Sequence, residues 1–196
     1  MIPTATRRAA GFDEVGRGCI AGAVIAAAVI LSEDAPPIPG LADSKKLTPR
    51  KRERLADLIK EQATAWAIGR AEPSEIDTIN VLQASLLAMR RAYDALGIRP
   101  ELGLIDGNRA PNLPCATRTI VGGDDSIPSI SAASILAKVY RDREMEIMDA
   151  LFPGYGFALH KGYPTAAHIA ALEEFGPSPV HRRSFAPVQR LSGLMP

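Results

Sequence analysis

The sequence predicts an α/β domain in which a mixed sheet is flanked by helices and followed by a C-terminal appendage. Strand-like and helical segments alternate along most of the chain, after an initial hairpin-like pair of strands. From about residue 154 to 196 the sequence is rich in Gly and Pro and carries one short helical pattern. A chain of 196 residues has the length of one domain. We therefore expect a single domain over residues 1–196, with 154–196 as its appendage.

The chain begins with two expected strands. Residues 9–15 form the first, and a Gly-Arg-Gly turn separates it from a β-branched run over residues 23–31. Residues 32–40 (SEDAPPIPG) then read as a proline-rich loop. This order predicts that the first two strands pair.

Two helices and a strand are expected next. Thr48 can cap the first helix, Pro49 suits its first position, and Leu55, Leu58 and Ile59 give it an apolar stripe. Residues 64–71 have a strand-like composition. The following helix has the clearest period and closes at Gly97. Its apolar positions are Leu82, Leu86, Met89, Tyr93 and Leu96.

The second half of the chain supplies two further strands and a long helix. Residues 102–106 read as a short buried strand that ends on Asp106, and residues 116–121 as another strand. A helical pattern over 129–152, with Leu136 and Val139 as core positions, is stopped by Pro153. A shorter helix is expected near residues 165–175.

Composition excludes several classes of protein. Hydrophobic residues make up 46% and charged residues 23%, as in ordinary globular enzymes. The longest apolar run, residues 21–31, is too short to span a bilayer, and the N-terminus lacks the apolar segment of a signal peptide. Two isolated cysteines predict neither disulfides nor a zinc site. We expect a cytoplasmic protein without a membrane partner. A net charge of +1 does not by itself indicate a nucleic-acid partner.

Acidic residues beside glycines at strand ends are the sharpest feature of the sequence. Asp13 and Glu14 precede the Gly-Arg-Gly turn, Asp106 ends a strand before Gly107, and Asp124 or Asp125 lies between a strand and a helix. Carboxylates that converge there would suit Mg²⁺ or Mn²⁺. In an ideal strand Asp13 and Glu14 point to opposite faces, so a shared site requires the strand to end or bulge there. Each acid could instead serve only in a turn or a helix cap.

Six strings in order along the chain resemble the ribonuclease HII family. They are GFDEVGRG with AGAV (11–18 and 21–24), LADSKKL (41–47), LIDGNR (104–109), ISAASILAK (130–138), HKGYPT (160–165) and RRSF (182–185). The resemblance covers nearly the whole chain. It implies a ribonuclease H-like fold with a mixed five-stranded sheet and a C-terminal helical extension. It also implies endonucleolytic cleavage of RNA in RNA/DNA hybrids, and on the 5′ side of single ribonucleotides in duplex DNA, leaving 3′-hydroxyl and 5′-phosphate ends.

The resemblance also assigns site residues. The four metal-binding carboxylates fall on Asp13, Glu14, Asp106 and Asp124, which selects Asp124 over Asp125, and they imply two Mg²⁺ or Mn²⁺ ions that hydrolyse the phosphodiester. The substrate-binding positions fall on the ribonucleotide-reading turn Gly16, Arg17 and Gly18, on the phosphate-contacting Ser44 and Lys45 with Lys46, and on Tyr163, which packs on the adjacent deoxyribose.

Some residues depart from the family pattern or receive no chemistry. The family commonly has a lysine where this chain has Gly122, so a phosphate contact there is in doubt. Asp142 also resembles a family position, but a mid-helix acid flanked by arginines is expected to form surface ion pairs. The three histidines, His160, His168 and His181, lack metal-ligand spacing and are assigned no role.

Two other functions remain open beside the favoured one. The first is a different nuclease of the same fold class, such as a resolvase or a transposase-like domain, which would cut branched DNA and ignore ribonucleotides. The second is a catalytically silent duplex-binding module, although four carboxylates would only repel its ligand. We expect a monomeric enzyme whose partners are RNA/DNA hybrids and ribonucleotide-containing duplex DNA.

Overall fold

The computed structural model describes residues 8–32, 34–41 and 44–191. Within them, five strands form one sheet in the order β3-β2-β1-β4-β5. They are β1 (Ala9–Val15), β2 (Val24–Leu31), β3 (Ala63–Ala71), β4 (Leu102–Asp106) and β5 (Ala116–Ile120). The pairs β1–β2 and β2–β3 are antiparallel, whereas β4 and β5 continue the sheet parallel to β1. The expected mixed five-stranded sheet is confirmed.

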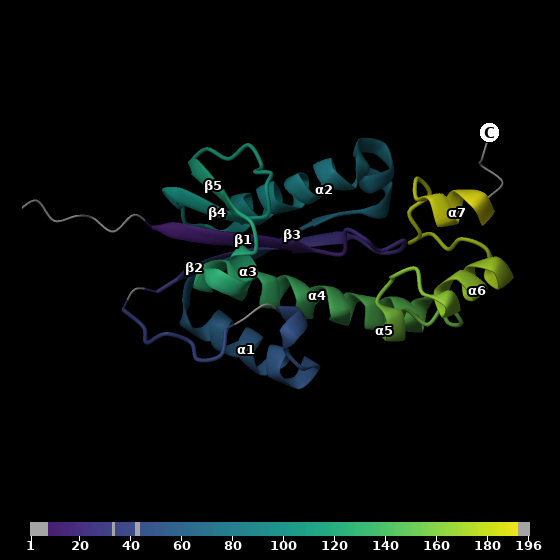
Figure 1. The fold of residues 1–196 in the computed structure, drawn as a ribbon, viewed down its shortest axis with the longest axis horizontal. Coiled ribbons are helices and arrows are strands. Elements are labelled where there is room, and N and C mark those ends of the chain that lie inside the picture. Colours follow the sequence, from purple (N-terminus) through teal and green to yellow (C-terminus); the bar gives the residue numbers. More distant parts are fainter. Residues whose placement is uncertain (1–7, 33, 42–43, 192–196) are drawn as a thin grey trace, which may run out of the picture.

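Helices cover both faces of this sheet. They are the 3₁₀ turn η1 (Ser44–Lys46), α1 (Pro49–Gln62), α2 (Pro73–Ala95), α3 (Gly123–Ser126), α4 (Pro128–Leu151), α5 (Phe157–His160), α6 (Ala166–Phe175) and α7 (Ala186–Leu191). In Figure 1 the sheet is seen almost edge-on, with α2 on one side and with α1 and α4 on the other. None of the described helices has the length and apolar character that crossing a membrane requires.

The strand β2 is covered by helices on both faces of the sheet and is buried on both. Ala26 and Ala28 belong to the core under α2, together with Phe12. Ala27 and Val29 belong to the core under α1 and α4. A strand buried on both faces reads as a continuous apolar run rather than an alternating one, which is the pattern seen here. The small alanine side chains leave room for helices to pack closely on each side.

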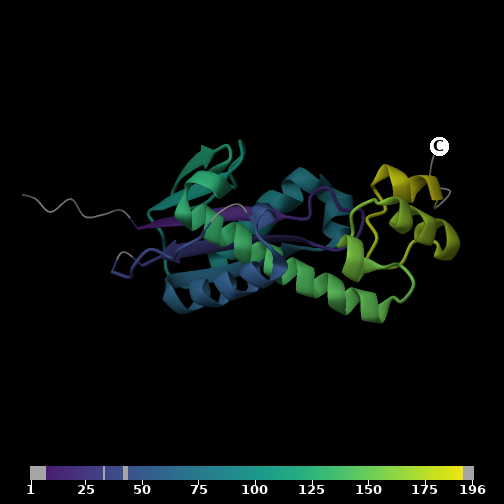
Figure 2. The ribbon, with the colours of Figure 1, turned by 60° about the horizontal axis from the view of Figure 1, so that its bottom comes forward.

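The helix α4 connects the sheet to the C-terminal segment. Its first turns pack against β1 and β2, and its last turns extend beyond the sheet to α5 (Figure 2). There Met145 joins a third core with Ile20, Phe157 and Leu172. The C-terminal segment therefore packs on the far end of α4 and on the loop that follows β1.

The main differences from the expected elements concern helix starts and short helices. The helix expected from its apolar period corresponds to the second part of α2, because Asn80, at φ 68°, interrupts the helix and its Oδ1 accepts from the amides of Leu82 and Gln83. The first part begins at Pro73, where Glu72 and Glu75 form a capping box. The short helices α3, α5 and α7 were not expected, since four to six residues are too few to display a helical period.

Candidate active site

The acidic residues lie where the parallel strands β1 and β4 end side by side. Asp13 and Glu14 are near the carboxyl end of β1, and Asp106 is the last residue of β4. Asp124 lies in α3, which follows β5. Adjacent parallel strands present their carboxyl ends at the same edge of a sheet, so the fold brings these four residues to one region.

Asp13 is buried beneath this edge with 7% of its surface exposed. Its carboxylate accepts a hydrogen bond from the Glu14 amide (2.7 Å) and faces the hydroxyl of Ser134 on α4. Burial raises the pKa of Asp13 well above its usual range, and the negative charges of Glu14 and Asp106 raise it further. No described cation forms a salt bridge with the Asp13 carboxylate, and no cation is among the causes of its pKa shift.

Glu14 occupies the other face of β1. The register of β1 with β2 is regular through Val15, so neighbouring side chains on β1 point to opposite faces. The strand has no bulge at Asp13 and Glu14 and ends one residue later, at Val15. The Glu14 carboxylate pairs with Arg17 (3.1 Å) and lines a small recess beside α2 with Asp106 and Arg109. Burial raises the pKa of Glu14, and Arg17 partly opposes that effect.

Asp106 links the two faces. Its charge acts on both Asp13 and Glu14, and its carboxylate accepts a hydrogen bond from the Asp124 amide (3.3 Å). Even so, no group of three acidic, histidine or cysteine side chains in the described ranges is arranged closely enough to hold a metal ion. The four carboxylates thus lie near the strand ends but do not converge on a single metal position in this structure.

Asp124 and Asp125 differ in their surroundings. The Asp124 carbonyl accepts from Ser131 Oγ (2.7 Å), which fixes the start of α4 against α3. The exposed Asp125 carboxylate instead pairs with Lys46 (2.7 Å). This pair places a lysine beside α3 from another segment, although the lysine expected at the position of Gly122 is missing. Gly122 itself has φ 68°, a left-handed conformation that suits glycine.

The Gly16–Gly18 turn and Tyr163, both predicted to contact the substrate, are neighbours in space. Gly16 is buried, whereas Arg17 and Gly18 are exposed. A Cβ placed on Gly18 would lie 3.8 Å from Cε1 of Tyr163, whose residue surface is 43% exposed. An exposed aromatic ring therefore flanks a turn that lets a ligand approach the backbone closely. Burial of part of the ring raises the pKa of the Tyr163 hydroxyl.

The segment expected to contact phosphate has two kinds of residue. Ser44 is directed inward, with 3% of its surface exposed and its Oγ 2.9 Å from Ser134 Oγ, so its hydroxyl supports the site from behind. Lys45 and Lys46 are exposed. Arg52 fixes this segment by donating to the carbonyls of Ser44 (2.9 Å) and Leu47 (2.6 Å).

Asp142 forms ion pairs, as expected, but with other partners. It pairs with Lys138 (2.7 Å) and Arg52 (3.6 Å) rather than with the arginines on either side of it in the sequence. Through Arg52 it supports the Ser44–Lys46 segment. This placement favours the structural interpretation of Asp142.

Several residues near the site were missed by reasoning from the sequence. Ser134 faces Asp13, and its only signal was a hydroxyl among the apolar residues of a buried helix. Arg109 follows Asp106 in a loop and lines the recess beside Glu14. His168 Nδ1 lies 2.8 Å from the Tyr163 carbonyl, so a histidine that was given no role supports the Tyr163 loop. Its spacing from the other histidines gave no hint of this contact.

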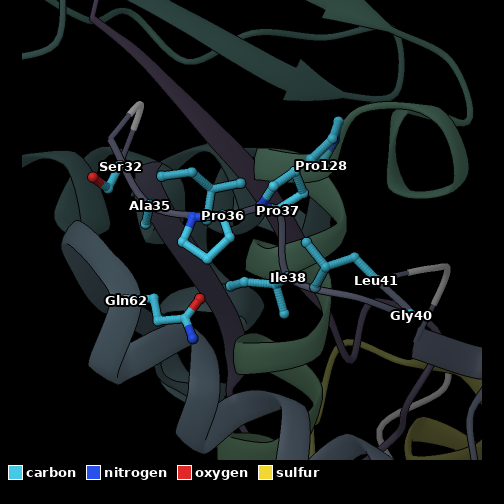
Figure 3. A pocket seen from close by; sticks show the side chains of 10 residues that line it. Ser32, Ala35, Pro36, Pro37, Ile38, Gly40, Leu41, Gln62 and Pro128 are labelled. Carbon is cyan, nitrogen blue, oxygen red and sulfur yellow. The ribbon is translucent and has the colours of Figure 1, made fainter.

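A larger cavity lies elsewhere and carries no comparable chemistry. It measures about 440 Å³ and is bounded by the proline-rich loop, by Gln62 at the end of α1 and by Pro128 at the start of α4 (Figure 3). Among the described residues, its lining contains none of the four carboxylates and no titratable side chain. The candidate site is therefore the group of carboxylates with the adjoining turn and Tyr163.

Comparison with known proteins agrees with these features. The family model described as ribonuclease HII matches residues 10–188. The ribonuclease HII of Nitrosococcus oceani is 59% identical over 184 residues, which are 94% of this chain and 91% of that protein. The ribonuclease H2 of Pyrococcus horikoshii OT3 has a TM-score of 0.78 at 25% identity, over 95% of this chain and 97% of that one. A ribonuclease HII from Archaeoglobus fulgidus, solved in a complex with PCNA, has a TM-score of 0.74 at 26% identity, over 93% and 96% of the two chains. This chain thus belongs to the ribonuclease HII family and is a hydrolase, an endoribonuclease of the ribonuclease H class.

Proposed function

We propose that this enzyme hydrolyses the RNA strand of RNA/DNA hybrids and cuts duplex DNA on the 5′ side of a single embedded ribonucleotide, leaving 3′-hydroxyl and 5′-phosphate ends. The observation that carries the proposal is the position of the Gly16–Gly18 turn, between the carboxylates on one side and Tyr163 on the other. A turn that admits the 2′-hydroxyl and an aromatic ring that packs on deoxyribose would recognise a junction between RNA and DNA.

Divalent ions, Mg²⁺ or Mn²⁺, are the proposed cofactors, with Asp13, Glu14, Asp106 and Asp124 as their ligands. The donor set fits chemically, because carboxylate oxygens are the ligands that these ions prefer. Burial raises the pKa of Asp13 and of Glu14, and the neighbouring carboxylates raise both further; a bound cation would favour the charged forms of these groups. When bound, two ions provide an activated water and stabilise the leaving oxygen.

The chain's own residues bind and orient the substrate. Arg17 is exposed enough to reach a phosphate, and the glycines on either side let the backbone approach the ribose. Lys45 adds a point charge for the phosphate backbone, which fixes register without reading sequence. Tyr163 packs against the deoxyribose next to the ribonucleotide. Ser44 contributes from behind, through Ser134 and Asp13.

A labelled DNA duplex with one ribonucleotide tests this proposal. We expect cleavage on the 5′ side of the ribonucleotide with Mg²⁺ or Mn²⁺, and none after chelation by EDTA. Asp13→Asn is expected to abolish cleavage and to leave binding of the hybrid duplex largely intact, because it removes a metal ligand and no substrate contact. Wild-type turnover by Asp13→Asn would contradict the assignment.

Neighbouring acids provide a matched control. Asp124→Asn is expected to remove activity, whereas Asp125→Asn breaks only an exposed ion pair with Lys46 and should keep it. Cleavage of branched all-DNA substrates, with indifference to ribonucleotides, would favour a resolvase-like nuclease instead. Duplex binding without any metal-dependent cutting would favour a silent binding module. A single-domain, monomeric enzyme of the cytoplasm remains our prediction.

A further inference from the structure

Two buried arginines lie behind the ribonucleotide-reading turn. Arg141, on α4, is 1% exposed, and Arg182, in the loop before α7, is 0% exposed. Among the described residues neither of them forms a salt bridge. Buried charges are usually paired with an opposite charge, so these two need another explanation.

Arg182 holds the inner side of the turn. Its Nη1 donates to the Arg17 carbonyl (3.1 Å) and its Nε to the Gly22 carbonyl (2.9 Å). Its own amide donates to the Ile20 carbonyl (2.8 Å). One residue near the end of the chain thus binds three carbonyls of the segment that follows β1, which leaves Arg17 and Gly18 on the outer, exposed side.

Arg141 joins the same segment to the Tyr163 loop. Its guanidinium donates to the carbonyls of Ala21 (3.0 Å) and Lys161 (3.1 Å), and also to that of Ala23. It packs directly under Gly16, where an added Cβ would lie 2.6 Å from Arg141 Nε. Since Lys161 is two residues before Tyr163, this side chain connects the two parts of the substrate-reading surface.

The arrangement is costly if stability is its only purpose. Arg182 Nη2 has no hydrogen-bond partner among the described residues. Burial and the nearby charge of Arg141 lower the pKa of Arg182 to about 9, so it stays charged at neutral pH. Burial of a charge without an opposite charge carries a desolvation cost, which hydrogen bonds to carbonyls offset only in part. Rigid carbonyl-binding forks, by contrast, fix the relative placement of backbone segments.

We propose that Arg182 and Arg141 are positioning residues, which hold the Gly16–Gly18 turn and the Tyr163 loop in one relative geometry and so set the discrimination between ribonucleotide and deoxyribonucleotide. This role rests on the proposed function. Neither arginine touches the substrate. The C-terminal segment acts on the site through Arg182, although it lies about 165 residues further along the chain from the turn.

Two substitutions of Arg182 test the role. Arg182→Met removes the donors and the charge, and Arg182→Lys keeps the charge but cannot span two carbonyls as a fork does. Arg183→Met is the matched control, because this neighbour is exposed. For each variant we would measure kcat and KM on a duplex with one ribonucleotide, together with the melting temperature. Affinities for that duplex and for an all-DNA duplex of the same sequence would be measured with Asp13→Asn added, to prevent cleavage.

Both Arg182 variants are expected to lower kcat and the ribonucleotide-to-DNA affinity ratio roughly tenfold to hundredfold, since small misplacements of binding groups are amplified in the transition state. Arg183→Met should keep the ratio, because any phosphate contact it makes is shared by both duplexes. If Arg182→Met fails to fold, Arg182→Lys decides. A folded Arg182→Lys with the wild-type ratio and kcat would overturn the role. Absence of any ribonucleotide preference in the wild-type enzyme would instead refute the proposed function, and this role with it.

Discussion

Acidification is expected to destabilise the C-terminal segment through a chain of buried histidines. The Ser178 amide, which can only donate, lies 3.0 Å from His181 Nδ1. His181 Nδ1 must therefore accept, so His181 Nε2 carries the proton and donates to His168 Nε2 (3.0 Å). His168 Nδ1 then donates to the Tyr163 carbonyl (2.8 Å). Both imidazole rings are neutral in this arrangement. Protonation of either ring removes its acceptor nitrogen and so breaks one of these hydrogen bonds.

The sign of the effect follows from the direction of the pKa shifts. Burial is the main cause that lowers the pKa of His168 and of His181, each from 6.5 to about 4. Below pH 6.5 the unfolded chain therefore binds more protons than the folded one. Stability is complete above pH 6.5 and is lost as the pH falls from there toward 4. At pH 5 the loss is roughly 2 kcal/mol for one ring with such a shift. The two rings contact each other, so their contributions are coupled and do not simply add.

Urea unfolding at pH 7.5 and pH 5 measures this loss. The double variant His168→Gln/His181→Gln removes both titrating groups, so its free energy of unfolding should change much less between the two pH values. Glu75 does not confound the comparison, since its pKa is lowered to about 2 and its contribution is lost only below its usual value of 4.5. Burial raises the pKa of Asp13, Glu14 and Glu144, which favours the folded state at pH 5 in both proteins, so the quantity compared is the difference between the wild type and the double variant. An equal change in the free energy of unfolding between the two pH values in both proteins would refute the reasoning.

Three further predictions concern single side chains. Ser134→Ala removes the hydroxyl that faces Asp13, and we expect kcat to fall roughly tenfold; the melting temperature should also fall, because the buried Ser44 hydroxyl loses its contact with Ser134, and an unchanged kcat in steady-state assays would argue against the support of Asp13. Gly122→Ala forces a side chain into a left-handed conformation at φ 68°, which should cost about 1 kcal/mol in urea unfolding, and a stabilised variant would contradict this. Glu75→Gln weakens the pair with Arg91 (2.7 Å); because that pair is partly exposed, the loss in chemical unfolding should be at most about 1 kcal/mol, and a much larger one would show that solvent screening has been overestimated.

Much of the fold was accessible from the sequence because its signals are local. Each strand was expected within one or two residues of its observed bounds, since apolar runs between turn residues mark strands. The long helix α4 was expected because its apolar residues recur over many turns. The start of α2 was missed because Asn80 breaks the period, although Glu72 and Glu75 carried a capping signal that could have located it.

The candidate site was only partly accessible. Nearby glycines predicted that Asp13, Asp106 and Asp124 lie close to strand ends. The structure places Asp13 near the end of β1, Asp106 at the end of β4 and Asp124 in α3, just after β5. The faces to which the carboxylate side chains point could not be predicted, because the sequence does not distinguish a regular strand from one with a bulge. The observed register sends Asp13 and Glu14 to opposite faces of β1.

Contacts between distant segments could not be foreseen. Arg182 and Arg183 are adjacent and chemically identical, yet the first is fully buried and the second exposed. Only the packing of the C-terminal segment on the loop after β1 distinguishes them. The histidines likewise meet through tertiary structure, with no spacing that announces their contact.

The C-terminal segment is therefore more than an appendage to the sheet, because it contacts the residues around the candidate site. It contains Tyr163, a proposed substrate-binding residue, supports the Tyr163 loop through His168, and reaches the inner side of the Gly16–Gly18 turn through Arg182. An apolar replacement of Arg182 would avoid the cost of burying a charge but would leave the carbonyls of Arg17 and Gly22 without these donors. A more stable Arg182→Met that has lost its preference for ribonucleotides would show that this cation is retained for recognition. Stability and specificity would then depend on the same few buried atoms, and would change in opposite directions when those atoms are replaced.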